Sequence, residues 1–534
     1  MKVRRLQTLN FQLSNLKPAP MKKLSFLTRA SFLIGGFFAL DKGLAFLRSI
    51  IIARQFNLSF ELDAFNVANN LPDMLFALIS GGAMSMALIP VLSEYLTTRG
   101  RSEAWKLFSR IANLAFAVTA FMAIIIAIFA EQIVRSEIGI APGFGVAEQD
   151  VIIKLMRLNL IATTIFSVSG LVMGGLQANQ HFFLPAMAPA LYNIGQIFGA
   201  LVFSPSEPYS IAGIEFPALG LGVHGLVYGV ILGATLHLGI QIPGLIKYKF
   251  RWTPSITLKD EGVRKALKIM GPRLVTIFGI QLIFIARDNF ASRLDAVGAV
   301  TALTYGWMIM QVPATLLGTA IATAILPTLS EYAATGNWTK FREIVERAIR
   351  VLIALTLPLA AILAAGLLPL VRLVFGFDVD GAALLTWTTR AYLLTLVGYS
   401  IQEIFSRAFY ARKEALVPLA TIFVRFGFYI LAGVIVVNYF PRLSAAGLAL
   451  AELAVVVEAA LMLYLMNARL PTRITAFPSL LRGLAAALLG GVSAYAIALY
   501  LPGGAVVTAI IGMLVGAGIA LPIVWKEIRL LFNL

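Results

Sequence analysis

Apolar runs long enough to span a bilayer recur along the chain, and charged or Gly/Pro-rich turns separate them. A spanning helix needs about 20 mostly apolar residues. The pattern predicts fourteen such helices, at 30–54, 66–92, 105–130, 152–176, 182–204, 218–246, 267–291, 297–329, 348–374, 384–410, 415–438, 443–467, 477–501 and 504–525. The strand alternation over ~10 residues that is typical of a membrane β-barrel is absent. We therefore expect an all-α, polytopic membrane protein.

Composition agrees with this class. The chain is 59% apolar and 13% charged, whereas soluble domains carry about 25% charged residues. It contains no cysteine, which excludes disulfides and thiolate metal sites. Its three histidines, His181, His224 and His237, lie too far apart in sequence to form a metal-ligand motif.

The net charge of +17 could indicate nucleic-acid binding, but its distribution favours a membrane explanation. The first 29 residues are basic without one acidic residue, and the turns after even-numbered spans are also basic. The opposite turns are acidic or neutral. By the positive-inside rule, both termini are expected in the cytoplasm, with the excess charge facing anionic lipids rather than nucleic acid.

An internal repeat divides the chain. Residues 87–95 and 324–332 read almost alike, and two further pairs of segments match in the same order at nearly the same separation. These pairs are 62–64 with 294–296, and 178–185 with 411–418. An offset of six helices keeps both copies in one orientation, so we expect two parallel six-helix lobes around a central cavity. The last two helices fall outside the repeat, and their glycines predict close packing.

The expected domains follow from these spans. They are a basic cytoplasmic tail at 1–29, an N-terminal lobe at 30–247, a cytoplasmic linker at 248–266, a C-terminal lobe at 267–468 and an added helix pair at 469–534.

Ionisable residues inside the spans are candidate functional groups, because burying them in lipid is costly. Lys42 and Arg48 are placed to line one side of a cavity at two depths, while Asp41 could simply pair with a neighbouring cation. Arg273 follows a Pro272 break, which suits either anion binding or plain packing. Arg287 and Asp288 lie further along the same span.

The second half carries further charges. Arg425 lies in mid-span and is expected to neutralise Glu452, while Arg390 and Arg407 are expected to extend toward the interface. The first-half and seventh-helix charges are mostly cationic, so the expected ligand is an anion such as a phosphate.

No enzyme motif accompanies these charges. The sequence lacks a phosphate-binding P-loop, a nucleophile elbow and a His/carboxylate metal motif. We expect a transporter without a cofactor, driven by an ion gradient, the membrane potential or its substrate's own gradient.

Motifs across 30–465 resemble those of the MurJ (MviN) lipid II flippases. They are the segment from Gly43 to Arg54, Leu62-Asp63-Ala-Phe65, Asn70-Leu-Pro72, Gly82-Ala83, Pro90-x-Leu-Ser-Glu94, Met270-Gly-Pro272, Gln281, Phe290-Ala-Ser292, Leu317-Gly318, Leu326-Pro-x-Leu-Ser330 and Phe409-Tyr410-Ala-Arg412.

The resemblance implies a multidrug/oligosaccharidyl-lipid/polysaccharide exporter fold in the bacterial cytoplasmic membrane. It implies movement of lipid II, the undecaprenyl-diphosphate-linked peptidoglycan precursor, by alternating access. The last two helices would hold the lipid tail, and peptidoglycan synthases would be partners. It places Lys42 and Arg48 on the family's cationic pair of helix 1, which would bind substrate, and Asp63 on its essential outer acid, which would serve gating. From their places in the seventh span we also expect Arg273 to bind substrate and Arg287 and Asp288 to serve gating or transport.

The chain also departs from the family pattern. Phe76 and Ala77 stand where the family carries basic residues on helix 2, and helix 8 reads Tyr305-Gly-Trp307-Met308 in place of a Tyr-Ala-Asp-Arg-like element. Arg273 and Arg287 could substitute for the missing charges. Some relatives bind sodium through helices 7 and 11; here Arg287 and Arg425 occupy those helices, and a fixed guanidinium replacing the ion is our hypothesis.

Other functions remain open from the sequence. They are a flippase for another polyprenyl-linked glycan, a small-molecule antiporter of the same superfamily, and a non-transporting scaffold on the same fold. A membrane glycosyltransferase is disfavoured, because no long outer loop could carry its acidic site.

Overall fold

The computed structural model describes residues 26–81, 83–211 and 213–531, and helices dominate them. The helices of the first part are α2 (Phe26–Phe56), α3 (Phe60–Phe76), α4 (Ala83–Thr98), α5 (Gly100–Ile128), α6 (Ala130–Arg135), α7 (Val146–Ala178), α8 (Phe183–Phe198), α9 (Val223–Gly239) and α10 (Ile242–Lys247). Those of the second part are α11 (Glu261–Ser292), α12 (Ala299–Pro313), α13 (Ala320–Ala334), α14 (Trp338–Phe375), α15 (Val379–Ala411), α16 (Leu416–Tyr439), α17 (Ser444–Ala451), α18 (Ala454–Asn467), α19 (Phe477–Tyr500) and α20 (Ala505–Leu531).

Short irregular elements complete the chain. Wide π-helical turns η1 (Ala77–Gly81), η2 (Gly199–Phe203) and η3 (Ala314–Thr319) continue α3, α8 and α12, and the 3₁₀ turn η4 (Pro441–Leu443) precedes α17. The strands β1 (Tyr209–Ile211) and β2 (Ile214–Phe216) form an antiparallel hairpin in the loop before α9. The hairpin is a small departure from the expected all-α chain.

Most of the predicted spans fall in helices with the length and composition of membrane-crossing segments. Within the described residues, 11 helices are long and apolar enough to cross a bilayer. In the described residues, the three remaining predicted spans, 30–54, 66–92 and 384–410, also fall in helical elements: α2 for the first, α3, η1 and α4 for the second, and α15 for the third.

The start of α14 differs from the prediction. The basic stretch before 348 was expected in a turn, yet α14 already begins at Trp338. Three ion pairs one helical turn apart, among them Arg342–Glu346 at 2.9 Å, support this helical segment. The alternating charges therefore stabilise a helix that extends beyond the apolar run.

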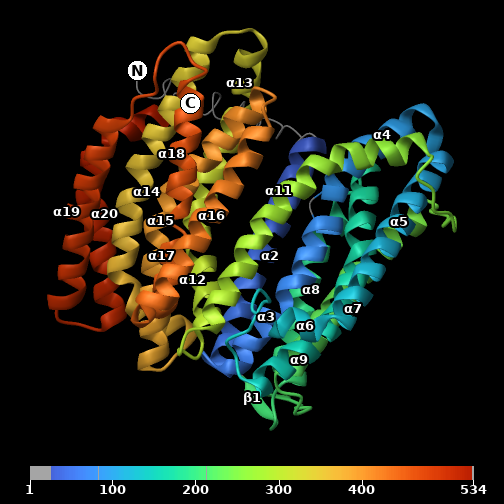
Figure 1. Cartoon of the computed structure of the whole chain (residues 1–534), viewed down its shortest axis with the longest axis horizontal. Helices are drawn as coiled ribbons and strands as arrows, with labels where there is room; N and C mark the ends of the chain where they lie inside the picture. Colours follow the sequence, from blue (N-terminus) through green and yellow to red (C-terminus); the bar gives the residue numbers. More distant parts are fainter. Residues whose placement is uncertain (1–25, 82, 212, 532–534) are drawn as a thin grey trace, which may run out of the picture.

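The helices group by sequence, as Figure 1 shows. Helices α2–α10, which we call the first half, lie together, and α12–α18, the second half, lie beside them with α11 between the two. The ribbons of the halves meet at the end of the molecule where α3 and α12 begin, and they diverge toward the end where α11 begins.

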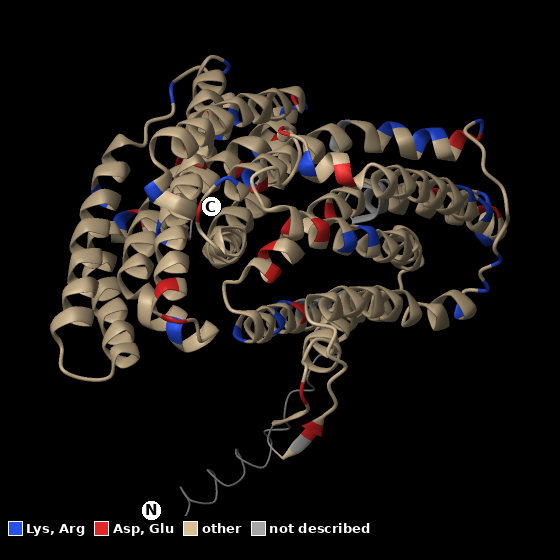
Figure 2. Ribbon diagram, turned by 60° about the horizontal axis from the view of Figure 1, so that its bottom comes forward, with Lys and Arg blue, Asp and Glu red and all other residues tan. Residues whose placement is uncertain are grey.

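The pair α19–α20 packs against α14 at one edge of the molecule (Figure 1). The predicted close packing of its glycines is confirmed: Cβ atoms added at Gly490 and Gly516 would lie 2.7 and 2.4 Å from the carbonyl oxygen of the other residue. Figure 2 shows that this pair is almost free of charged residues along its length.

The first part of α11 packs on the first half. Val263 and Ala266 are buried in one cluster with Leu107 of α5 and Leu92 of α4. Ion pairs reinforce this contact, with Lys265 bound to Glu94 at 2.5 Å. Helix α11 therefore bridges the two halves.

The contact between α8 and α9 depends on two facing glycines. A Cβ at Gly195 would lie 2.4 Å from the Cα and N atoms of Gly233, so the backbones touch. Because backbone cannot move aside cheaply, we expect Gly195→Ala to cost about 1–3 kcal/mol of stability. Thermal unfolding of the purified protein measures this as a lower Tm. Gly239→Ala, where a Cβ meets nothing within 4 Å, is the control and should not lower Tm; equal melting of both variants would contradict the close approach.

Candidate functional site

A cavity of about 710 Å³ lies between the two halves. Helices α2, α3, α7, α8, α9, α11 and α12 supply its walls. Aromatic side chains form part of the lining, and its polar groups are amides, hydroxyls and a few charged side chains. The cavity therefore combines apolar surface with separate hydrogen-bonding groups, as binding sites for organic ligands do.

Arg48 lines this cavity, as predicted, and Lys42 does not. Arg48 Nη1 donates to Asn193 Oδ1 at 3.0 Å, and Asn193 Nδ2 donates to Asp41 Oδ1 at 2.8 Å. Lys42 Nζ lies 3.7 Å from the Asp41 carboxylate, and its side chain is 65% exposed. Asp41 thus pairs with a neighbouring cation, as the simpler of the two expectations predicted, and the Lys42 side chain lies outside the cavity lining.

Helix α3 presents a polar face to the cavity that the sequence analysis missed. Asn66, Asn69, Asn70 and Asp73 all line the cavity. Their spacing of three or four residues places them on one side of the helix. That spacing was the available signal, but it was obscured because the residues stand in a largely apolar span.

The described lining is not cationic overall, in contrast to the expectation from sequence. Its charged members are Arg48, Asp73, Arg287 and Asp288, and Arg287 is already paired with Asp288 at 2.8 Å. Formal charges in this part of the lining therefore cancel. The Arg273 side chain lies outside the described residues.

Asp63 joins the two halves at the end where α3 begins. Its Oδ2 accepts from Gly298 N at 2.9 Å, and its Oδ1 accepts from both Thr301 N and Thr301 Oγ1, at 2.7 and 2.6 Å. Asp63 is only 1% exposed. A carboxylate of the first half thus caps the N-terminus of α12 in the second half, where helix N–H groups lack intrahelical partners.

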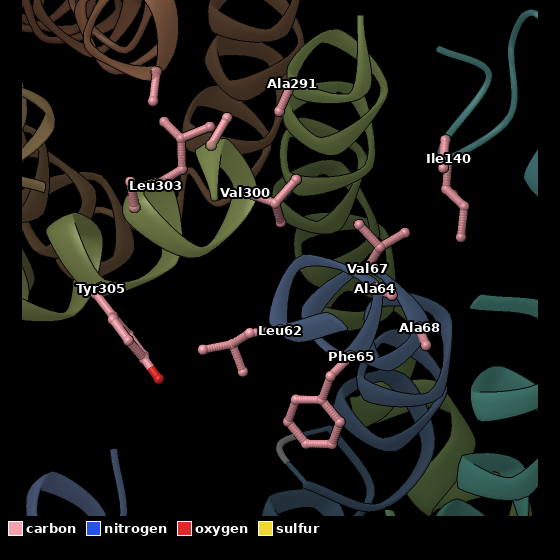
Figure 3. Close-up of a cluster of buried hydrophobic side chains, with 14 of the residues drawn as sticks. Leu62, Ala64, Phe65, Val67, Ala68, Ile140, Ala291, Val300, Leu303 and Tyr305 are labelled. Atoms are coloured by element: carbon pink, nitrogen blue, oxygen red, sulfur yellow. The ribbon is translucent and has the colours of Figure 1, made fainter. Parts of the chain in front are cut away.

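Apolar side chains close the same region. Figure 3 shows Leu62 of α3 near Val300 and Leu303 of α12, with Ala291 of α11 close by. Gly298 sits at φ +82°, and a Cβ there would lie 2.5 Å from that of Leu58. The two halves are therefore in close contact at this position.

Arg287 and Asp288 form a second buried connection. Asp288 Oδ2 accepts from Asn70 Nδ2 of α3 at 2.8 Å, while Arg287 Nη2 donates to Thr304 Oγ1 of α12 at 3.3 Å. The pair on α11 therefore contacts both halves beside the cavity. Arg287 thus already has a buried acidic partner.

Further cross-half bonds lie at this same end. Arg54 of α2 donates to the carbonyl oxygens of Leu373 and Val374 at the C-terminal end of α14, at 2.7 and 3.0 Å. Among the described residues, the other hydrogen bonds between the first half and α12–α20 are those that Asp63 accepts, the one from Asn66 to Thr301, and the one from the Tyr305 hydroxyl to the Ser49 carbonyl. At the opposite end of the molecule, the first half is hydrogen-bonded to segment 248–265, through Glu94, Arg99, Trp105 and Arg110. We call the contacts that Arg54, Asp63 and Asn66 make with the second half the seal.

The remaining predicted charges have partners outside the cavity. Arg425 contacts Glu452 at 2.8 Å, which confirms the expected pairing. Arg407 binds Glu403 at 2.7 Å, and Arg390 donates to the Ala364 carbonyl at 2.8 Å. Both are part-buried in these contacts.

Solved structures of membrane transporters share this fold. A MATE-family multidrug transporter of the MOP superfamily in an inward-facing conformation superposes with a TM-score of 0.66 at 15% identity, covering 79% of this chain and 93% of that one. A structure titled lipid II flippase MurJ, inward closed conformation, superposes with a TM-score of 0.75 at 20% identity, covering 94% of this chain and 100% of that one.

Sequence comparison identifies the family. The family model for lipid II flippase MurJ matches residues 52–515. The lipid II flippase MurJ of Burkholderia cenocepacia is 28% identical over 79% of this chain and 80% of its own length. The probable lipid II flippase MurJ of Vibrio cholerae is 25% identical, covering 77% of each chain. The chain belongs to the MurJ family of lipid II flippases.

The Asp63 cap provides a direct test of the seal. In Asp63→Asn the amide keeps one acceptor oxygen and turns an NH₂ group toward backbone donors. Hydrogen bonds to charged groups contribute about 1.5–3 kcal/mol each, so the seal should open at least tenfold more often. The chain lacks cysteine, so a single Asn69→Cys reporter can be labelled with an impermeant thiol reagent applied on the side where α3 begins. We expect at least tenfold faster labelling in the Asp63→Asn background.

Asp150→Asn is the matched control, because Asp150 pairs with Arg135 inside the first half at 2.6 Å. It should leave the labelling rate unchanged. Equal rates for the Asp63 variant and its parent would show that this carboxylate does not hold the seal.

Proposed function

We propose that this chain is a transporter that moves lipid II from the inner to the outer leaflet of the bacterial cytoplasmic membrane. Membership of the MurJ family carries the proposal, and the cavity between the two halves supports it. Cell-wall biogenesis and cell shape depend on this step, because the precursor is made inside the cell and polymerised outside.

The proposed topology has fourteen spans with both termini in the cytoplasm. The end where α11 begins carries basic turns, such as the one with Lys247, Lys249 and Arg251, and is cytoplasmic by the positive-inside rule. The seal then lies at the outer face. We propose an N-terminal lobe at 30–247 and a C-terminal lobe at 267–468, linked by 248–266, with 1–29 as a cytoplasmic tail.

Arg48 is the proposed anchor for the diphosphate. It is the described lining cation that has no acidic partner within ion-pair distance, and its guanidinium can bind phosphate oxygens through two parallel hydrogen bonds. Lys42 stands near the same Asp41–Asn193 cluster and would attract the anion toward it. Arg273 is proposed as a further substrate contact from its place on α11.

The proposed mechanism is alternating access. The saccharide headgroup enters the cavity from the cytoplasmic side, while the Asp63 cap and the Arg287–Asp288 connection keep the outer face closed. Breaking these contacts and parting the halves at the seal then exposes the headgroup outside. Since α11 packs on the first half and donates from Arg287 to Thr304 of the second, it is positioned to transmit this movement.

The lipid tail does not need to enter the cavity. We propose that residues 469–534 form a lateral surface for it, because α19 and α20 present exposed apolar side chains such as Leu488 and Leu514. Membrane lipids surround this face, and peptidoglycan synthases that use the delivered lipid are the proposed protein partners. Nucleic acid has no role in this account.

Complementation tests the function. In bacteria depleted of their own lipid II flippase, expression of this chain should restore lipid II at the outer leaflet, measured by its accessibility to an external probe. Arg48→Ala removes a charged contact of about 1.5–3 kcal/mol, so we expect at least a tenfold loss of outer-leaflet lipid II. Arg251→Ala, an exposed cation in the cytoplasmic turn, is the control and should retain activity.

The outcomes separate the alternatives. No rescue by well-inserted wild-type protein would point to another polyprenyl-linked glycan. Rescue that persists in Arg48→Ala would contradict diphosphate binding at this residue and favour a scaffold role.

A further inference from the structure

A second cavity, of about 370 Å³, lies within the second half. Its charged lining residues are Glu403, Arg407, Arg425, Glu452 and Glu458, from α15, α16, α18 and the end of α17. Glu403 and Arg407 balance each other as an ion pair at 2.7 Å. The other three comprise two carboxylates and one guanidinium.

These three residues are buried among the helices of the second half. Arg425, Glu452 and Glu458 are 7%, 3% and 0% exposed. With both carboxylates ionised, the cluster would carry one net negative charge, which costs several kcal/mol in an interior of low dielectric. The cluster therefore needs one further positive charge to be neutral.

The two carboxylates differ in their partners. Glu452 Oε2 accepts from Arg425 Nη2 at 2.8 Å and from the Tyr399 hydroxyl at 2.9 Å. Both interactions favour its charged form.

Glu458 is held more weakly. Its Oε1 accepts from Thr421 Oγ1 at 3.2 Å, and its Oε2 lies 3.7 Å from Arg425 Nη1 with no hydrogen-bond partner although it is buried. Glu458 is thus the acid whose second oxygen can carry a proton.

We propose that Glu458 is a proton-binding site, and that the second cavity serves this transporter as the place where a proton is taken up and released. The bound proton neutralises the cluster on the unpartnered Oε2. A metal ion fits less well, because the Arg425 guanidinium beside that oxygen would repel it. Among the described residues, no group of three acidic or histidine side chains is placed to hold a metal.

Besides the charged residues named above, the titratable side chains that line the second cavity are Tyr399 and Tyr410 of α15. Tyr429 of α16, whose hydroxyl is buried without a hydrogen-bond partner, lies outside this lining. From α11 and α12, the lining contributes only uncharged side chains.

An aromatic contact connects this site to the central cavity. Phe284 and Trp307 line both cavities and pack edge to face at 5.7 Å. Trp307 also contacts Tyr399 at 5.0 Å between ring centroids, and Tyr399 bonds Glu452. The charge state of the cluster can thus affect the wall of the central cavity, which would couple transport to a proton gradient.

Infrared spectroscopy of the full-length purified protein tests proton binding without any transport assay. A buried protonated carboxyl group gives a carbonyl band distinct from that of a carboxylate. At neutral pH, we expect the difference between wild type and Glu458→Gln to show the loss of one such band. Glu527→Gln, which removes a buried acid paired with Arg482, should cause no loss.

A second variant covers a failure of Glu458→Gln to fold. In Glu452→Gln the cluster holds one acid and one guanidinium, so Glu458 should lose its proton and the same band should disappear. An unchanged band in both variants, or its displacement by added sodium at constant pH, would overturn the proposal. Failure of lipid II transport in complementation would leave the band unaffected, so the two proposals fail separately.

In vesicles, an imposed proton gradient should change the lipid II translocation rate of wild type and leave that of Glu458→Gln unchanged. An equal response of both proteins would likewise contradict proton coupling at Glu458.

Discussion

The contact between the two halves depends on the hydrogen bonds that the Asp63 carboxylate accepts. It accepts three hydrogen bonds from the first turn of α12 while it belongs to α3. A buried carboxylate left without these donors would be costly, and so would the unpaired N–H groups of a helix start. While the seal is closed, the two halves therefore satisfy these polar groups for each other.

A contact of this kind suits a transporter that must close one face while the other is open. The bonds around Asp63 are few, local and polar, so water can replace them when the halves separate. The packing within each half depends instead on close backbone approaches such as Gly195–Gly233. Strong packing inside the halves and exchangeable hydrogen bonds between them allow the halves to move as units, with α11 attached to both.

Much of the fold follows from the sequence, because spanning helices need long apolar runs and their charges follow the sides of the membrane. The site was less predictable. The Arg425–Glu452 pairing could be anticipated from the cost of a lone buried charge. That Glu458 also contacts Arg425 could not, because it depends on how each helix is rotated about its axis, which the sequence does not show. Lys42 was expected in the cavity, but its side chain is 65% exposed and is not part of the lining, because the sequence does not show how α2 is rotated against its neighbours. Asp73 was missed, because a single acid in an apolar span shows its role only when its neighbours on α3 are seen to face a cavity.

The central claim is that the halves must part at the seal for the substrate to leave. A cysteine pair at Asn66→Cys and Thr301→Cys tests it directly, because these side chains contact across the seal at 3.0 Å and the chain has no other cysteine. Outer-leaflet lipid II would be measured before oxidation, after oxidation and after reduction, with each single variant as control. The account predicts that the disulfide reduces translocation to background and that reduction restores it. Full translocation by the cross-linked protein would contradict it.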